Sequence, residues 1–144
     1  MRLTESRLRK IIREEIELTV PPTGLELEVG GKPVNAEVAA CPQSRNQGLM
    51  YRMGLAPDCG MLFVYPDSAL RSFWMENTYI PLSIAFIDEA CVILNIEDMV
   101  PFDRNNVGSE GDAVYALEMV QGWFGENQVG AGRKVAGLPG YSVM

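Results

Sequence analysis

The sequence predicts a mainly-β single domain, folded as a sandwich or compact barrel with two short helices. Its length of 144 residues suits one domain, and such a chain can bury about two-thirds of its unfolded surface. About eight short apolar runs are separated by Gly, Pro, Asn and Asp, which is typical of strands joined by turns. Hydrophobic residues make up 47% of the chain and charged residues 22%, which is ordinary for a globular protein.

Residues 3–18 are predicted to form an N-terminal amphipathic helix. Apolar side chains recur at helical spacing from Leu8 to Ile16, and a pair of prolines then ends the pattern. The chain therefore divides into a helical extension at 1–20 and a β domain at 21–144. An isolated helix of this length is marginal in water. Its Leu/Ile stripe is expected to dock on its own domain, on a symmetry mate or on another protein.

The remaining elements follow from the alternation of apolar and polar residues and from the turn signals. Strands are expected, in chain order, at 25–29, 34–39, 61–65, 72–75, 82–88, 92–97 and 114–119, with a last strand or turn at 129–138. Short helices are expected at 42–50 and 121–127, and a long polar loop at 101–112.

Composition excludes several classes of function. The chain has no histidine, which rules out Ser-His-Asp and Cys-His catalysis and any histidine-ligated metal. The net charge of −7 argues against nucleic-acid binding, which needs clustered positive charge. No glycine-rich phosphate-binding motif is present. Acid–base chemistry would therefore fall to Asp, Glu, Tyr, Cys or Lys.

The cysteines and the hydropathy pattern indicate a cytoplasmic protein. Cys41, Cys59 and Cys91 are odd in number and far apart, which fits a reducing compartment better than a disulfide framework. No run of about 18 apolar residues occurs, so no transmembrane helix and no membrane association are expected. The basic N-terminus lacks an apolar core after it, so no secretory signal is expected.

No cofactor and no metal are expected. Oxygen-bearing side chains do gather near the long polar loop, at Glu97, Asp98, Asp103, Asn105 and Asn106. Hard cations prefer such ligands. Their spacing matches no calcium-binding loop, however, so a solvated acidic loop is the ordinary interpretation.

Six segments, in the same order along the chain, resemble the DUF192 (UPF0127) family. They are Gly48–Arg52, Gly60–Val64, Ser72–Asp88, Met99–Pro101, Tyr115–Glu118 and Gly122–Asn127. The resemblance spans about residues 32–136. It implies a jelly-roll-like, mainly-β single domain whose biochemical role is not established.

The chain departs from the family pattern at three places. Glu76 stands where the family usually has a basic residue, and Ser83 where it usually has Asp. The segment 132–135 lacks an Asp that usually precedes its Val. If Glu76 lies in a cleft, a ligand that pairs with the base in relatives would be repelled here. Residues 1–15 resemble a leader found on proteins of marine tailed phages, which suggests a phage or metagenomic origin.

Residues 71–81 are the strongest candidate for a binding cleft. This stretch combines bulky aromatic side chains with many hydrogen-bonding groups, between two apolar runs. A small polar molecule or a peptide is the expected ligand. The predicted ligand-binding residues are Arg52, Arg71, Trp74, Asn77, Thr78, Tyr115 and Glu118.

Each of these residues also has a structural interpretation. Trp74 could stack on a ligand or fill the core. Asn77 and Thr78 could present an amide and a hydroxyl to a ligand or satisfy the backbone of a turn. Arg52 and Arg71 could bind a carboxylate or phosphate or form internal ion pairs.

Glu118 lies in a predicted strand, where it shares a face with Ala116 while Tyr115 points to the other face. A half-buried carboxylate needs a partner, and Arg52 or Arg71 could serve. If Glu118 instead lines a cleft with Tyr115 nearby, it is the best general-base candidate in the chain.

Three functions stay open from sequence. The leading one is binding of a small polar molecule or peptide in the cleft around 71–81. The second is an accessory or structural interaction module, of phage origin, that docks through the helix at 3–18. The third is a hydrolase or lyase that uses the Glu118 carboxylate.

Overall fold

A computed structural model describes residues 24–140. The predicted helix at 3–18, and with it the proposed extension at 1–20, lies outside the described residues. Nine strands and two short helices build the described part, which confirms the mainly-β prediction. Between residues 24 and 140 no helix is both long and apolar enough to cross a membrane.

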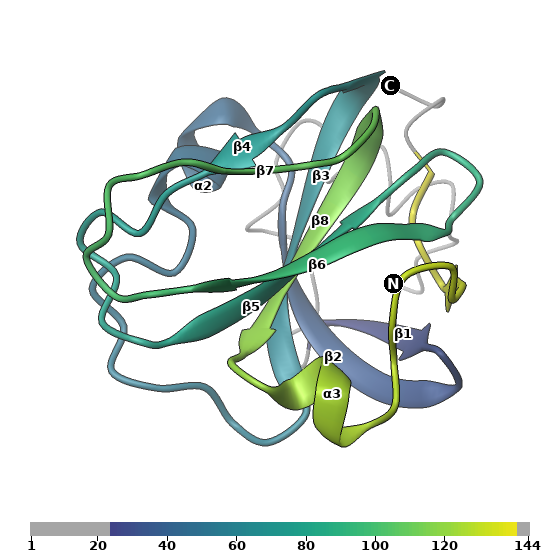
Figure 1. The fold of residues 1–144 in the computed structure, drawn as a ribbon, viewed down its shortest axis with the longest axis horizontal. Coiled ribbons are helices and arrows are strands. Elements are labelled where there is room, and N and C mark those ends of the chain that lie inside the picture. Colours follow the sequence, from purple (N-terminus) through teal and green to yellow (C-terminus); the bar gives the residue numbers. More distant parts are fainter. Residues whose placement is uncertain (1–23, 141–144) are drawn as a thin grey trace, which may run out of the picture.

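Seven strands form one sheet, in the order β6-β5-β8-β3-β2-β1-β9, and the other two pair as a ribbon (Figure 1). The strands are β1 (Leu25–Val29), β2 (Lys32–Ala39), β3 (Cys59–Ala69), β4 (Ser72–Phe73), β5 (Leu82–Ile87), β6 (Ile93–Met99), β7 (Val107–Gly108), β8 (Ala113–Val120) and β9 (Val135–Ala136). Every described pair of neighbouring strands is antiparallel except β2 and β3.

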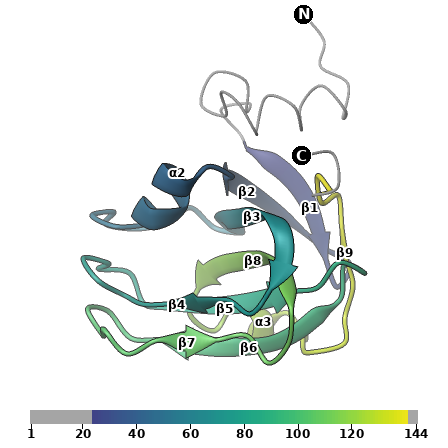
Figure 2. The same cartoon turned by 90° about the horizontal axis from the view of Figure 1, so that it is seen from above.

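The seven-stranded sheet is strongly curled. Figure 2 shows β1 and β2 on one side of the bend and β5 and β6 on the other, so that the sheet makes a half-barrel. The finer prediction of a jelly-roll-like sandwich is not confirmed, because the described strands form one curled sheet and a ribbon.

Strand β8 lies inside the sheet, between β5 and β3, and separates two apolar clusters. Tyr115 and Leu117 belong to one cluster, and Ala116 belongs to the other. This alternation follows from the two-residue period of a strand. The first cluster also contains Leu27, Val38, Leu62, Trp123 and Phe124, and the second also contains Leu49, Phe63, Met75, Ile84 and Phe86.

Helix α2 (Pro42–Gln47) lies in the connection between β2 and β3, which pair in parallel. Parallel neighbours need a crossover of about a dozen residues or more, and residues 40–58 supply it. Leu49, just after α2, is buried in the second cluster. The crossover therefore covers the face of the sheet that carries this cluster. The second helix, α3 (Trp123–Glu126), follows β8 and buries Trp123 and Phe124 in the first cluster.

The long loop predicted at 101–112 contains strand β7. Phe73 of β4 pairs with Val107 of β7, and Ser72 pairs with Gly108. A two-residue strand has too few positions to show an alternating pattern, so sequence alone could not reveal it. The ribbon lies beside the second apolar cluster, against which Phe73 and Val107 pack.

Gly60 sets the spacing between β3 and β8. A Cβ atom at this position would lie 2.2 Å from the backbone oxygen of Glu118 and 2.4 Å from Sδ of Met119. The two strands therefore approach more closely here than any side chain allows, and this contact holds the Glu118 backbone against β3.

Gly60→Ala is expected to destabilise the domain by about 2–3 kcal/mol or more, because overpacking forces the backbone to shift. Urea unfolding monitored by tryptophan fluorescence measures the change. Gly54→Ala is the matched control, since a Cβ there meets no atom within 4 Å. Equal stability of the two variants would contradict the close approach.

Candidate functional site

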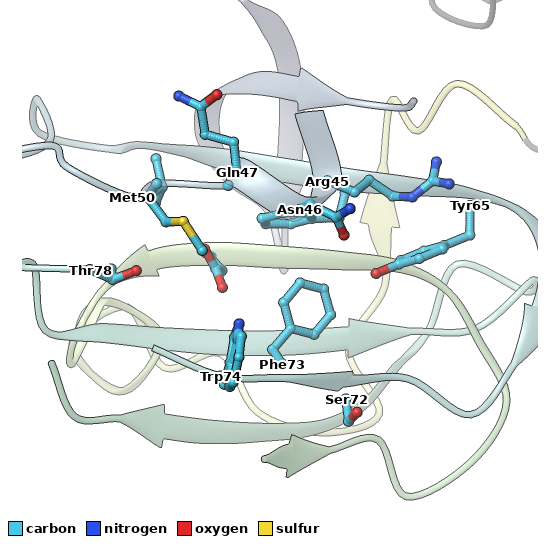
Figure 3. Close-up of a pocket in the computed structure, with 13 residues that line it drawn as sticks. Arg45, Asn46, Gln47, Met50, Tyr65, Ser72, Phe73, Trp74 and Thr78 are labelled. Carbon is cyan, nitrogen blue, oxygen red and sulfur yellow. The ribbon is translucent and has the colours of Figure 1, made fainter. Parts of the chain in front are cut away.

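A cavity of about 160 Å³ opens between α2, the middle of β3, β4 with the turn after it, and β8. Figure 3 shows side chains from these elements around one space. The lining residues are Arg45, Asn46, Gln47, Gly48, Leu49, Met50, Phe63, Tyr65, Ser72, Phe73, Trp74, Thr78 and Glu118. The cavity thus combines aromatic faces with a few polar groups, the usual character of a small-molecule site.

Glu118 is the buried charged residue of this cavity. It lies on β8 between Met61 of β3 and Ile84 of β5 and is only 4% exposed. No side chain or backbone group among residues 24–140 makes a hydrogen bond or ion pair with its carboxyl group. Burial alone raises the pKa of Glu118 from its ordinary value of 4.5 to about 8. The carboxyl group therefore holds its proton at neutral pH.

Aromatic rings form one wall of the cavity. Phe73 packs edge-on against Phe63, with ring centroids 4.8 Å apart, and contacts Phe86 at 5.8 Å. These contacts fix the Phe73 ring in the second apolar cluster. Trp74 is 45% exposed and stands at the mouth (Figure 3). The wall is therefore rigid at its inner end and accessible at its outer end.

Tyr65 lies between two arginines. The guanidinium carbon of Arg71 is 3.8 Å from the centre of the tyrosine ring, and that of Arg45 is 4.8 Å away. Burial raises the pKa of the Tyr65 hydroxyl, and the two positive charges oppose this increase only in part. The hydroxyl therefore stays protonated, and Figure 3 shows it directed toward the middle of the cavity.

Both arginines are held by backbone carbonyls. Nη1 of Arg45 donates to the oxygens of Ala40 and Val64, at 2.7 and 2.9 Å. Nε of Arg71 donates to the oxygen of Ala113 at 2.9 Å, and its Nη2 pairs with Asp67. Arg45 thus ties α2 to β3, and Arg71 ties β3 to β8. Neither guanidinium pairs with Glu118.

The turn after β4 closes the other end of the cavity. The backbone nitrogen of Thr78 donates to the oxygen of Met75 at 3.2 Å, and Asn77 has a left-handed φ of 53°. Asparagine tolerates this conformation better than most residues. Thr78 Oγ1 donates to the oxygen of Glu76 at 3.0 Å. Thr78 is buried and its side chain lines the cavity.

The structure brings three of the seven predicted site residues to the cavity: Trp74, Thr78 and Glu118. The other four lie outside its lining. Arg52 makes a two-pronged ion pair with Glu37, with 2.7 Å between Nη2 and Oε1. Arg71 reaches the site only through the Tyr65 ring, and Asn77 serves the turn.

Tyr115 lies on the opposite face of β8 from Glu118, in the first apolar cluster. Its hydroxyl accepts a hydrogen bond from the Gly140 nitrogen at 2.9 Å. The expectation of Tyr115 beside a Glu118 cleft is therefore wrong. Tyr115 and Glu118 are three residues apart, and residues an odd number of positions apart in a strand point to opposite faces.

Sequence reasoning missed Arg45, Asn46, Phe63 and Tyr65, which also line the cavity. They come from α2 and β3, far in sequence from residues 71–81. The signal that could have found them is the parallel crossover, which places α2 over the face where Phe63, Tyr65 and Glu118 point.

The family departures at Glu76 and Ser83 do not alter the cavity lining. Glu76 forms an ion pair with the exposed Arg104, at 2.6 Å. The buried Ser83 donates to Asp98 Oδ1 at 2.8 Å and accepts from the Gly122 nitrogen at 3.0 Å. Repulsion of a ligand by Glu76 therefore finds no support, because this side chain lies outside the cavity lining.

Two wider hollows lie elsewhere on the surface, with volumes of about 480 and 500 Å³. Their charged side chains, Glu26, Glu28, Asp58 and Glu126, are exposed. Within the described part of the chain, no three Cys, Asp or Glu side chains gather closely enough to hold a metal ion. The cavity at Glu118 therefore differs from both hollows in its buried carboxyl group.

Fold and site together define a small curled-sheet β domain with one charged group buried beside a polar and aromatic cavity. The family model of DUF192, described as "Uncharacterized ACR, COG1430", matches residues 25–137. The chain belongs to the DUF192 family, as its sequence motifs predict. The comparison with curated proteins gives no match.

Two solved structures are similar to this chain. A protein from Sinorhizobium meliloti 1021, described as a "putative transcription regulator", has 34% sequence identity and a TM-score of 0.74. The similarity covers 80% of this chain and 92% of that one. A protein of unknown function from Novosphingobium aromaticivorans has 30% identity and a TM-score of 0.74, covering 80% of this chain and 88% of that one.

Glu118 is expected to make stability fall as pH rises from 4.5 to about 8. Below pH 4.5 both the folded and the unfolded chain hold the proton. Between the two values the unfolded chain loses the proton while the folded chain keeps it, so the folded state loses stability. Above about 8 both states are ionised, and the loss levels off.

The Glu118→Gln variant cannot titrate at this position and isolates the effect. Its free energy of unfolding, relative to wild type, is expected to increase by roughly 4–5 kcal/mol between pH 4.5 and 8. Urea unfolding of both proteins at several pH values measures this difference. Parallel pH profiles would show that the folded-state pKa of Glu118 is ordinary.

Proposed function

We propose that this protein binds a small polar organic molecule in the cavity between α2, β3, β4 and β8. The observation that carries the proposal is the Glu118 carboxyl group, which is 4% exposed, lines the cavity and has no partner among the described residues. Buried polar groups in folded proteins nearly always have a hydrogen-bonding partner. A bound molecule would supply one.

The volume of the cavity limits the ligand. About 160 Å³ is well below the roughly 300–1,000 Å³ of pockets for drug-sized molecules. A molecule of few non-hydrogen atoms fits this space, and a peptide could insert only one side chain. Of the two ligands expected from the sequence, a small polar molecule is therefore better supported than a peptide.

The aromatic and polar groups of the lining would contact different parts of the ligand. Phe73 and Trp74 offer flat apolar faces to the body of the ligand. The Tyr65 hydroxyl, the Thr78 hydroxyl and the Asn46 amide can donate or accept hydrogen bonds near the cavity (Figure 3). Together with Glu118 these groups could fix the orientation of a small polar molecule.

A thermal-shift screen of small polar compounds tests the proposal, with ligand-induced quenching of Trp74 fluorescence as a second readout. Asn46→Phe is expected to abolish the stabilisation by any hit, because a bulky ring on α2 would fill the cavity. Gln43→Phe is the matched control: it lies on the same helix, is exposed and does not line the cavity.

Failure of every compound to stabilise wild type would contradict the proposal. So would a hit whose effect is the same in both phenylalanine variants, because that compound would bind elsewhere. Fluorescence is read in both phenylalanine variants as well, because Trp123, the other tryptophan, lines the separate hollow of about 500 Å³ and would report a compound bound there.

A second candidate function is acid–base catalysis by Glu118. Its raised pKa of about 8 favours this candidate, since a catalytic acid works best with a pKa near the operating pH. Tyr115 is not available as its partner, and Tyr65 is the tyrosine that lines the cavity. Turnover of a bound compound by wild type but not by Glu118→Gln would support it.

Two further predictions belong with this proposal. A cytoplasmic location is supported by the three cysteines, which form no disulfide in the structure. Docking of the chain to a partner through residues 3–18 stays a prediction. Deletion of residues 1–20 tests it: partner binding should be lost while the β domain stays folded.

A further inference from the structure

Four polar or charged residues are buried in the described part of the chain: Thr78, Ser83, Asn95 and Glu118. Three of them have protein partners. Thr78 donates to a backbone oxygen, Ser83 bonds with Asp98 and Gly122, and the Asn95 side chain has partners in Glu97, Gly108 and Glu110. Glu118 is the exception: its carboxyl group has no partner in the described part of the chain and faces the cavity, where a ligand could complement it.

We propose that the cavity takes a small organic cation, with a primary ammonium or guanidinium group against Glu118 and an apolar body against Phe73 and Trp74. This inference rests on the proposed function of the same cavity. It adds the chemical class of the ligand.

A carboxylate accepts hydrogen bonds, and charge-assisted bonds from ammonium or guanidinium groups are about twice as strong as neutral ones. In a buried site this attraction is less screened than in water. A buried carboxyl group without a partner keeps its proton, as Glu118 does. A ligand cation would stabilise the ionised form, and the proton would leave to solvent.

The cavity walls also favour a cation. The faces of Phe73 and Trp74 carry partial negative charge, which attracts positive groups within about 6 Å. The Trp74 ring already accepts a cation, since the guanidinium carbon of Arg104 lies 6.0 Å from its centre. The whole chain carries a net charge of −7. Long-range attraction therefore acts in the same direction as the local contacts.

The charged groups around Glu118 leave room for a cation. Met61 and Ile84 flank Glu118 from β3 and β5, and both are apolar. Arg45 and Tyr65 are the other ionisable residues of the lining. The Arg45 guanidinium donates to two backbone carbonyls, and its carbon lies 4.8 Å from the centre of the Tyr65 ring. The cation would thus meet the carboxyl group in a lining whose one positive charge, that of Arg45, is already held by backbone carbonyls.

Three probes of similar size and different charge test the ligand class: n-butylammonium, 1-butanol and butyrate. Binding is followed by NMR shifts of the Phe73 and Trp74 ring signals in wild-type protein. The ammonium is expected to bind about tenfold more tightly than the alcohol, from one charge-assisted pair and a cation–π contact. Butyrate is expected to bind more weakly than the alcohol.

Glu118→Gln is expected to lower the affinity for n-butylammonium about tenfold, to the level of 1-butanol, and to leave 1-butanol unchanged. Glu28→Gln is the matched control, since it removes the same charge from an exposed position outside the cavity. If Glu118→Gln fails to fold, calorimetry of wild type at pH 6.5 in two buffers replaces it. Release of about one proton per bound ammonium is then expected.

The class is wrong if 1-butanol or butyrate binds as tightly as n-butylammonium, or if binding of the ammonium is independent of Glu118 or releases no proton. In those cases the proposed small-molecule site remains supported if Asn46→Phe abolishes the stabilisation by a compound from the screen. If neither the ammonium nor any screened compound binds, both the class and the site are wrong.

Discussion

The buried carboxyl group of Glu118 is the constraint on which the site depends. It lies on the interior strand β8, between two apolar residues of the neighbouring strands, and burial raises its pKa to about 8. A leucine side chain at this position could be buried without the desolvation penalty that a carboxyl group carries. The sheet keeps a carboxyl group there and places a cavity beside it, which is the arrangement that a binding or catalytic group needs and a structural ion pair does not.

The topology explains how a cavity can exist over the middle of a sheet. Parallel β2 and β3 require a crossover, and α2 within it covers one part of the face that carries Glu118. The ribbon of β4 and β7 covers another part. Arg45 and Arg71 fasten these covers to β3 and β8 through backbone carbonyls. The space left between the covers is the cavity, so its walls are held by bonds independent of any ligand.

The sequence predicted the strands of the main sheet well, because apolar alternation and glycine-rich turns are local signals. It also predicted that Glu118 shares a face with Ala116, since that follows from the strand period alone. The partner of Glu118 could not be predicted in the same way. Arg52 and Arg71 pair with Glu37 and Asp67, and such pairings depend on which strands are neighbours. Tyr65 and Arg45 were missed for the same reason.

The pKa of Glu118 in the ligand-free protein tests this description most directly. Carbon-13 NMR of the side-chain carboxyl group, followed from pH 4 to 10, gives the value. A midpoint near 8 is expected for a carboxyl group that is buried beside the cavity without a protein partner. A midpoint near the ordinary 4.5 would contradict it, because the group would then be solvated or paired, and the cavity would have no unpartnered carboxyl group to offer a ligand.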